Sequence, residues 1–227
     1  MKRTFLAAIM VLVSLPLTGC GGGSSSAPPP PPPPPTIVTQ ILSDPAFDGD
    51  IAHDLSTASA FTVTQGNTQS VFAGIDFVNG VEYRAFLDFP LSGQGGVPGD
   101  AIIESAILDI FINSILLQTA TDTIPIRIDL VFVPQPMIGT DFSRTSQPAL
   151  ATMTIAPPIS QADLSQHISI DVTSLMMEAQ RLGLPDFQVR ILEDNSIVGA
   201  PLGLIEINDT TGAFRGDLAP LLQVSYF

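Results

Sequence analysis

Residues 82–89 read Glu-Tyr-Arg-Ala-Phe-Leu-Asp-Phe, and this stretch decides the fold class. In a β-strand successive side chains point to opposite faces, so the stretch separates into two sets. The set expected to face the core is Tyr83, Ala85, Leu87 and Phe89. The set on the opposite face is Glu82, Arg84, Phe86 and Asp88. This alternation is typical of a half-buried strand.

Working outward from this strand, the chain contains more short apolar stretches that are bounded by Gly, Pro, Asn or Asp, as in β-proteins. In residues 126–133 the alternation recurs, with one set expected inward (Ile126, Ile128, Leu130 and Phe132) and another outward (Arg127 and Asp129). The other predicted strands are Ile37–Leu42, Phe61–Thr64, Ile102–Ile112, Ala151–Ile155, Ile168–Val172, Phe187–Leu192, Leu204–Ile207 and Leu221–Tyr226. In the strand over 102–112, Leu108 is expected to face the core and Asp109 the opposite side. Asn79-Gly80 predicts a type I′ hairpin turn, since both central residues of that turn need positive φ.

One helix is expected among these strands. Thr173 or Ser174 can cap its start, residues 175–182 form it, and Gly183 with Pro185 ends it. About ten strands with one short helix predict an all-β fold of the two-sheet β-sandwich type.

The first nineteen residues have the features of a signal peptide. Lys2 and Arg3 precede an apolar run over residues 5–15 that is too short to span a bilayer as a helix. The following Leu17-Thr18-Gly19-Cys20 resembles the lipobox of bacterial lipoproteins, which implies cleavage before Cys20 and a diacylglyceryl group on its thiol. Cys20 is the only cysteine of the chain, so an intramolecular disulfide is excluded. The alternative is an ordinary secretory signal beside a chance cysteine.

The lipobox resemblance also implies a location, the bacterial cell envelope. Gly21 follows the cysteine where an Asp would retain such a lipoprotein in the inner membrane. In a bacterium with two membranes this implies a lipid anchor in the outer membrane, on its periplasmic or surface face.

Three parts follow from these features. Residues 1–19 are the expected lipoprotein signal peptide, 20–36 the lipidated cysteine with a Gly/Ser/Pro linker, and 37–227 the β-sandwich domain. Pro28–Pro35 should form a polyproline II stalk that extends about 3.1 Å per residue, or roughly 25 Å.

The charge of the chain excludes one class of partner. The formal net charge is −14, and removal of Lys2 and Arg3 with the signal peptide leaves six arginines against 22 acidic residues, or −16. No lysine remains. Binding of nucleic acid needs clustered cations that displace counterions, so we expect no nucleic-acid partner.

Catalytic motifs are missing from the sequence. His53 and His167 are the only histidines, and neither a G-x-S-x-G nor an H-E-x-x-H motif occurs. We therefore expect a protein that is not an enzyme, and we predict no catalytic residue.

An acidic segment near the start of the domain predicts a calcium site, because calcium prefers six to eight oxygen ligands from carboxylates and carbonyls. The four candidate ligands fall within eleven residues: Asp44, Asp48, Asp50 and Asp54. The spacing is not that of an EF-hand, and the alternative is that these aspartates cap turns and face water. A second oxygen-rich pair of turns lies at 193–195 and at 208–209.

Several segments together resemble the DNRLRE-type domain, a jelly-roll β-sandwich of bacterial surface and secreted proteins. These segments are Ser43-Asp44-Pro45, Tyr83–Phe89, Ile103–Ile110, Ile170–Leu175 and Pro220–Tyr226. Some members of that family resemble carbohydrate-binding modules, so the resemblance implies a jelly-roll fold and polysaccharide as a ligand. After the Asp-Val-Thr of the fourth segment the family usually has a tryptophan, whereas this chain has none.

Aromatic residues are few, and both tyrosines, Tyr83 and Tyr226, are expected in the core. Our prediction is a lipid-anchored, non-catalytic binding module of the envelope, with a polysaccharide or an envelope protein as its partner. Two alternatives are a purely structural or assembly lipoprotein and an exported hydrolase or lyase of envelope material.

Overall fold

The computed structural model describes residues 32–57, 60–197 and 199–227. The signal peptide, Cys20 and most of the proline stretch lie outside the described residues. Among the helices of the described part, none is long and apolar enough to cross a membrane.

Fourteen strands and a few short helices make up the described chain. The strands are β1 (Ile37–Leu42), β2 (Gly49–Asp54), β3 (Phe61–Gln65), β4 (Ser70–Asp76), β5 (Val81–Pro90), β6 (Ile103–Leu117), β7 (Thr123–Ile124), β8 (Ile126–Val131), β9 (Ala151–Thr154), β10 (Ile159–Ser160), β11 (His167–Asp171), β12 (Asp186–Glu193), β13 (Gly203–Asn208) and β14 (Leu221–Tyr226). The α-helices are α1 (Thr173–Leu182) and α2 (Arg215–Leu218), and the 3-10 helices are η1 (Gly139–Phe142) and η2 (Gln161–Asp163). The all-β prediction is confirmed, and α2 is a second short helix that the sequence pattern did not predict.

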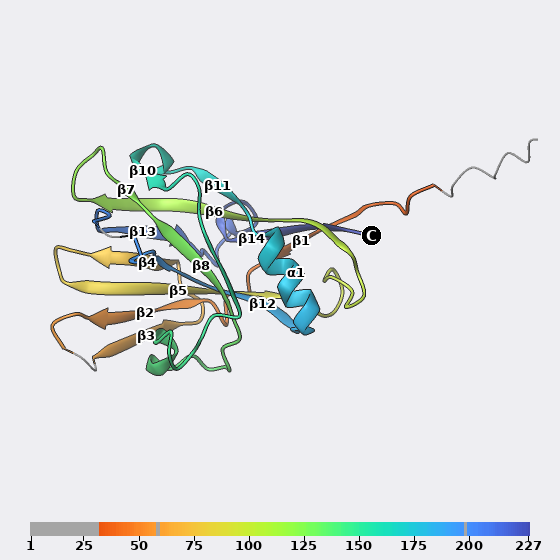
Figure 1. Cartoon of the computed structure of the whole chain (residues 1–227), viewed down its shortest axis with the longest axis horizontal. Coiled ribbons are helices and arrows are strands. Elements are labelled where there is room, and N and C mark those ends of the chain that lie inside the picture. The colour runs from red at the N-terminus through yellow and green to blue at the C-terminus, as the bar shows by residue number, and fades with distance from the viewer. Residues whose placement is uncertain (1–31, 58–59, 198) are drawn as a thin grey trace, which may run out of the picture. The chain divides into compact units, whose positions relative to one another are not determined.

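Twelve of the described strands form one large, curled antiparallel sheet, and β7 with β10 forms a small second sheet. The long strand β6 pairs with β14 and β11 through its first part and with β13 through its last part. Strand β5 pairs with β2 along one edge, while β4 and then β12 pair with its other edge. Strands β6, β13, β4, β5, β2 and β3 therefore follow one another across the sheet, as Figure 1 shows.

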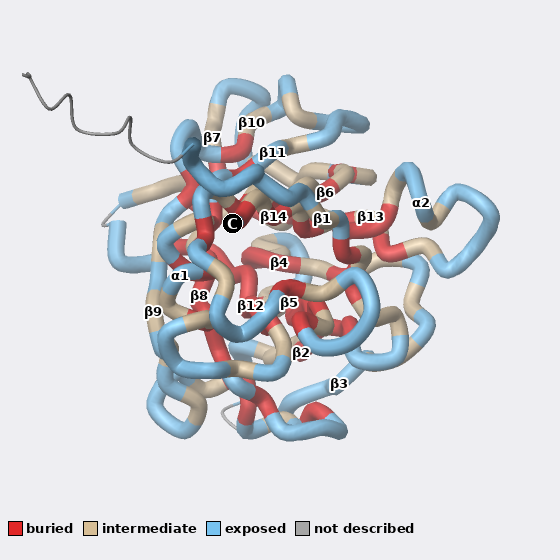
Figure 2. Tube along the Cα trace, turned by 90° about the vertical axis from the view of Figure 1, so that its right-hand side faces the viewer, coloured by how far each residue is buried: buried red, intermediate tan, exposed pale blue. Residues whose placement is uncertain are grey.

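The main core lies on the inner face of the curled sheet. Residues Leu87 and Leu108, expected inward, are 1% and 0% exposed, and Phe89 packs against Phe187 at 6.2 Å between ring centroids. Helix α1 adds Leu175, among others, to this core, and buried segments run along β4, β5, β8 and β12 in Figure 2. The predicted inward phase is correct for these leucines, since alternate residues of a strand share one face and Leu87 shares its face with Ala85 and Phe89 of the core.

Two residues that were expected in the core are not buried there. Strand β8 ends at Val131 rather than Val133, and Phe132 is 48% exposed because the chain leaves the sheet there. Tyr83 is only half-buried, since it lies beyond the part of the inner face that the core covers. The other tyrosine, Tyr226, is buried as expected.

The outer face of the sheet is covered as well, which the alternation did not predict. Residues 133–142, including η1, pack on this face and bury a second apolar cluster: Ile51, Phe86, Val131, Val133, Met137 and Phe142. The side chains of Arg84 and Asp88, on the outer face of β5, are buried beneath this cover. Arg84 pairs with Glu82 of its own strand at 2.6 Å and lies 3.9 Å from the Phe142 ring centroid.

A buried ion cluster lies under the same cover. Asp129 of β8 accepts hydrogen bonds from Arg127 Nε at 2.6 Å and from Arg190 Nη2 at 2.7 Å. The predicted outward phase of Asp129 is correct, but Asp129 and Arg190 are both 0% exposed, so this outward position is closed to solvent. The two are directly opposite each other in the register of β12 and β8, so the alternation places them on one face, and only the covering segment removes them from water.

Local signals for turns and helix ends are correct only in part. The predicted cap at Thr173 or Ser174 is wrong, because Thr173 is already the first residue of α1 and the preceding Val172 makes no side-chain cap hydrogen bond. Helix α1 ends at Gly183, whose φ of 66° is the left-handed conformation that glycine adopts without strain. The hairpin at Asn79-Gly80 joins β4 to β5, but its loop spans residues 77–80, and of those two residues only Gly80 has positive φ. Asp76 stabilises this longer loop because its side chain accepts the N–H groups of Val78 and Asn79.

Candidate ligand-binding face

A groove of about 390 Å³ lies where the inner face of the sheet extends beyond the core, on β2, β3 and β5. The register pairs Asp50 with Thr64, and Ala52 with Thr62, so alternate residues of β2 and β3 share this face. The complete lining is Asp50, Ala52, Asp54, Ala60, Thr62, Thr64, Val81 and Tyr83. The groove therefore offers two carboxylates, two threonine hydroxyls and one tyrosine.

Asp50 is the most constrained of these groups. Its side chain is buried, and Oδ2 accepts the N–H of Phe72 at 3.1 Å. Burial raises the pKa of Asp50 to about 6, although the Phe72 hydrogen bond acts in the opposite direction. The groove therefore contains a carboxylate that is ionised at neutral pH but poorly solvated.

Tyr83 and Asp54 are held in place by neighbours. The Tyr83 ring lies 5.5 Å from the ring of Phe72, and burial together with the carboxylates of Asp50 and Asp76 raises its pKa. Asp54 Oδ1 accepts the Ser56 hydroxyl at 2.6 Å and the Ser56 N–H at 2.8 Å, which lowers the pKa of Asp54. Both side chains thus have defined orientations before any ligand arrives.

The four aspartates of the calcium prediction occupy separate environments. Asp50 and Asp54 line the groove, whereas Asp44 accepts the N–H of Ala46 in a turn and Asp48 Oδ1 accepts the N–H of Asp88. In the part of the chain that the structure describes, no three His, Cys, Asp or Glu side chains gather around a common point in a way that could hold a metal ion. Calcium binding by these residues stays a prediction.

The structure instead places Asp48 beside Asp209, a pairing that the sequence did not predict. Both side chains are buried, and one oxygen of each, Asp48 Oδ2 and Asp209 Oδ1, has no hydrogen-bond partner among the described residues. Burial, and then the charge of Asp209, raise the pKa of Asp48, and burial also raises that of Asp209. Asn208-Asp209 is oxygen-rich in sequence, but Glu193 contacts Gly203 at the other end of β13, so the two oxygen-rich turns do not meet.

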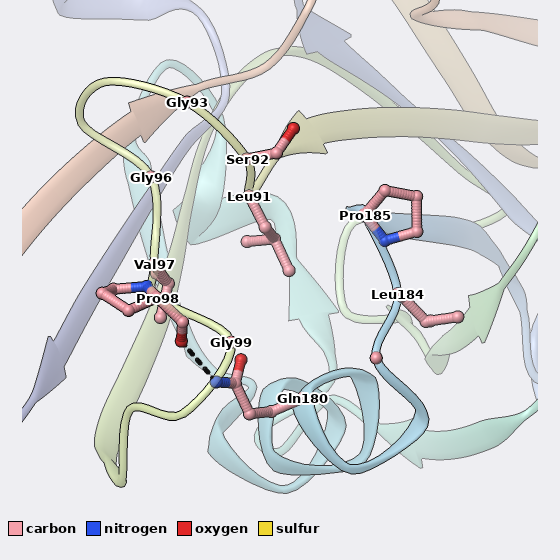
Figure 3. A pocket seen from close by; sticks show the side chains of 11 residues that line it. Leu91, Ser92, Gly93, Gly96, Val97, Pro98, Gly99, Gln180, Leu184 and Pro185 are labelled. Atoms are coloured by element: carbon pink, nitrogen blue, oxygen red, sulfur yellow. Dashed lines mark hydrogen bonds between the residues drawn. The ribbon is translucent and has the colours of Figure 1, made fainter.

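A second cavity, of about 370 Å³, lies between the loop after β5 and the end of α1 (Figure 3). Glycine, proline and leucine dominate its lining, which runs over residues 91–93, 96–99, 180 and 183–185. Gln180 Nε2 donates a hydrogen bond to the Pro98 carbonyl at 2.6 Å across it. None of these lining residues is ionisable, so this cavity has little chemistry with which to select a ligand.

The histidines do not form a catalytic arrangement with the neighbours described for them. His53 stacks on Phe61 at 4.7 Å between ring centroids. His167 Nδ1 lies 2.5 Å from Asp109 Oδ1, but Ser169 donates to the same Asp109 at 3.1 Å and is not hydrogen-bonded to the imidazole. A serine triad needs the hydroxyl on the histidine, so this cluster lacks that geometry.

Comparison with known proteins gives no family. The chain matches no protein-family model. No curated protein is significantly similar to it in sequence. The DNRLRE-type resemblance and the lipobox therefore stay predictions from the residues quoted for them.

Proposed function

We propose that the protein is a lipid-anchored, non-catalytic binding module of the bacterial envelope that binds polysaccharide in the groove on β2, β3 and β5. The observation that carries this proposal is the groove itself, which places an aromatic ring among carboxylates and hydroxyls. Sugars are recognised through an aromatic surface for the ring face and through hydrogen bonds to the hydroxyls. Tyr83, Asp50, Asp54, Thr62 and Thr64 supply both kinds of contact.

The fold supports this proposal at a coarser level. The inner face of one curled antiparallel sheet surrounds the main core, which is compatible with the jelly-roll sandwich that the DNRLRE-type resemblance implies. The jelly-roll topology of the domain is itself part of our proposal. In the same way, the lipobox resemblance supports lipidation of Cys20 and an outer-membrane location.

The geometry favours binding over hydrolysis. Asp50 and Asp54 are four residues apart on one strand, which separates their Cα atoms by roughly 13 Å. The carboxyl groups of glycosidases are about 5–9.5 Å apart, so that both can act on one glycosidic bond. Two carboxylates so far apart contact different parts of an extended ligand.

A glycan array tests the proposal. The probe protein is the mature chain with Cys20→Ala, which avoids the lipid, and the comparison variant is Thr62→Val combined with Thr64→Val. Both threonines are exposed, so the variant should fold and should lose most of the glycan signal. Thr152→Val on the exposed part of β9 is the matched control and should bind as the parent does.

Two results would count against the proposal. Glycan binding that survives in the Thr62 and Thr64 variant would place the ligand elsewhere. Absence of binding to every glycan would favour the structural or assembly role, in which the domain contributes only its folded surface to the envelope.

A further inference from the structure

We propose that the groove selects glycans that carry a protonated amine, such as units of non-acetylated amino sugar, over neutral and anionic glycans. This inference rests on the proposed function and adds the chemical class of the ligand. It comes from the distribution of charge around the groove.

The charges that face the groove are all negative. Asp50 and Asp54 lie in the lining, and Asp76, at the end of β4, is paired in register with the lining residue Val81. No residue of the lining is cationic. The arginine nearest in sequence, Arg84, lies on the opposite face of β5, where it pairs with Glu82. An anionic glycan would meet only repulsion here, whereas an ammonium group would be attracted.

Asp50 lacks the partner that a buried charge normally has. Only 4% of the residue is exposed, and its one hydrogen bond among the described residues, from the Phe72 N–H, uses a single carboxylate oxygen. Buried carboxylates are usually paired with a cation, since desolvation is costly for an isolated charge. Burial raises the pKa of Asp50 to about 6, and a bound ammonium would oppose this change. The ammonium would form charge-assisted hydrogen bonds, the strongest kind available in the groove.

The remaining lining distinguishes a sugar from other cations. Thr62 and Thr64 present exposed hydroxyls on the neighbouring strand, and Tyr83 presents part of its ring. A bare metal ion or a simple polyamine would use the carboxylates alone. An amino sugar would use all three kinds of group, because its amine, hydroxyls and ring face match carboxylate, hydroxyl and aromatic side chain.

Isothermal titration calorimetry of the mature Cys20→Ala chain tests this selectivity with three probes: oligoglucosamine, its fully N-acetylated counterpart and oligogalacturonate. We expect oligoglucosamine to bind at least about tenfold more tightly than the acetylated oligomer, and oligogalacturonate not to bind. Added salt should weaken the binding, since exposed parts of the interaction are screened. Lowering the pH through about 6 should weaken it further as Asp50 takes up a proton. Tyr83 is the other ionisable group of the groove that responds to the Asp50 charge.

Variants connect the selectivity with named groups. Asp50→Asn keeps the side-chain shape and should reduce the preference for the amine to about threefold or less, and thermal melting checks that it folds. Asp54→Asn, at a more exposed position, should also reduce the preference without risk to the fold. Asp217→Asn on exposed α2 is the control and should behave as the parent does.

The outcomes separate this inference from the proposed function. Equal binding of the two glucosamine oligomers, abolished by the Thr62 and Thr64 variant, would overturn the amine selectivity and retain the binding module. An amine preference that both aspartate variants retain would also overturn it. Binding of simple polyamines or cationic peptides as tightly as oligoglucosamine would show a general cation site and refute sugar selectivity. No binding of any probe or array glycan would refute both proposals.

Discussion

Replacing Asp129 with Asn removes the negative charge from an ion pair with Arg190 in which both side chains are closed to water. The carboxylate accepts Arg127 Nε at 2.6 Å and Arg190 Nη2 at 2.7 Å, and Arg144 Nε lies 3.7 Å away. Arg190 is 0% exposed, and its other hydrogen bonds go to the carbonyls of Asp141 and Gln147. The variant therefore leaves a buried guanidinium without a counter-charge.

The expected cost is about 3–5 kcal/mol in the free energy of unfolding, which is the range for breaking a buried ion pair by removal of one partner. Asp109→Asn is the matched control. Asp109 is partly exposed on β6, where it contacts His167, so the same substitution there should cost no more than about 1 kcal/mol. If Asp129 faced solvent, as the alternation alone suggests, the two variants would have equal stability.

Urea melts of the mature Cys20→Ala chain at neutral pH measure this difference. The double variant Asp129→Leu with Arg190→Met should be much more stable than the sum of the single effects predicts, because removal of both charges leaves none unpaired. Midpoints for Asp129→Asn and Asp109→Asn that agree within error would refute the buried cluster. Strictly additive losses in the double variant would refute the pairing.

The pH dependence of this pair has a definite sign. Burial would raise the pKa of Asp129, but its hydrogen bonds with Arg190 and Arg127 outweigh burial, so the native pKa is lowered. The unfolded chain then binds the proton more readily than the native chain does. The stabilisation is present above the unfolded pKa of about 3.9 and is lost as the pH falls through the native value. Asp129→Asn should therefore reduce the acid dependence of stability.

Four further predictions concern the core, the Asp48 pair, calcium and the anchor. Leu87→Ala and Leu108→Ala should each lower the free energy of unfolding by about 2–5 kcal/mol in urea melts, since both side chains fill the main core. A loss below about 1 kcal/mol in both variants would mean that the two strands turn their other face to the core. Asp48→Asn should flatten the decline of stability with rising pH. The reason is that the raised native pKa of Asp48 makes the folded chain bind the proton more strongly than the unfolded chain does above about pH 4. Denaturant melts from about pH 5 to pH 9 measure this decline, and parallel profiles for the variant and the parent would contradict the prediction. Calcium bound by the acidic segment would stabilise the fold by about 2.7 kcal/mol at 100 times Kd, and an equal melting midpoint in calcium and in chelator would leave the aspartates as turn formers. Cys20→Ala should release the protein from the membrane fraction, and mass spectrometry of the parent should detect an acylated Cys20; an unacylated N-terminal peptide would contradict the lipobox prediction.

The candidate site was predictable only in part. Asp50 and Asp54 were identified among the acidic residues, but as ligands of a calcium ion together with Asp44 and Asp48. Closeness in sequence does not bring side chains together along an extended strand, because successive residues point to opposite faces and each residue advances the chain by about 3.3 Å. Tyr83 was assigned to the core because its phase is correct, yet the core ends before the strand does.

Local periodicity by itself determined the all-β class, the inward phase of Leu87 and Leu108, and the end of α1 at Gly183. These features depend on the chirality and alternation of the backbone, which act over a few residues and leave a pattern in the sequence. Only the tertiary structure decided that residues 133–142 cover the outer face, that Asp129 meets Arg190 in a dry environment, and that β2 and β3 extend beyond the core to form a groove. These features depend on contacts between segments that are distant in sequence, because burial is decided by which segment packs over a face of the sheet. The alternation of a strand is the same whether water or protein lies above that face.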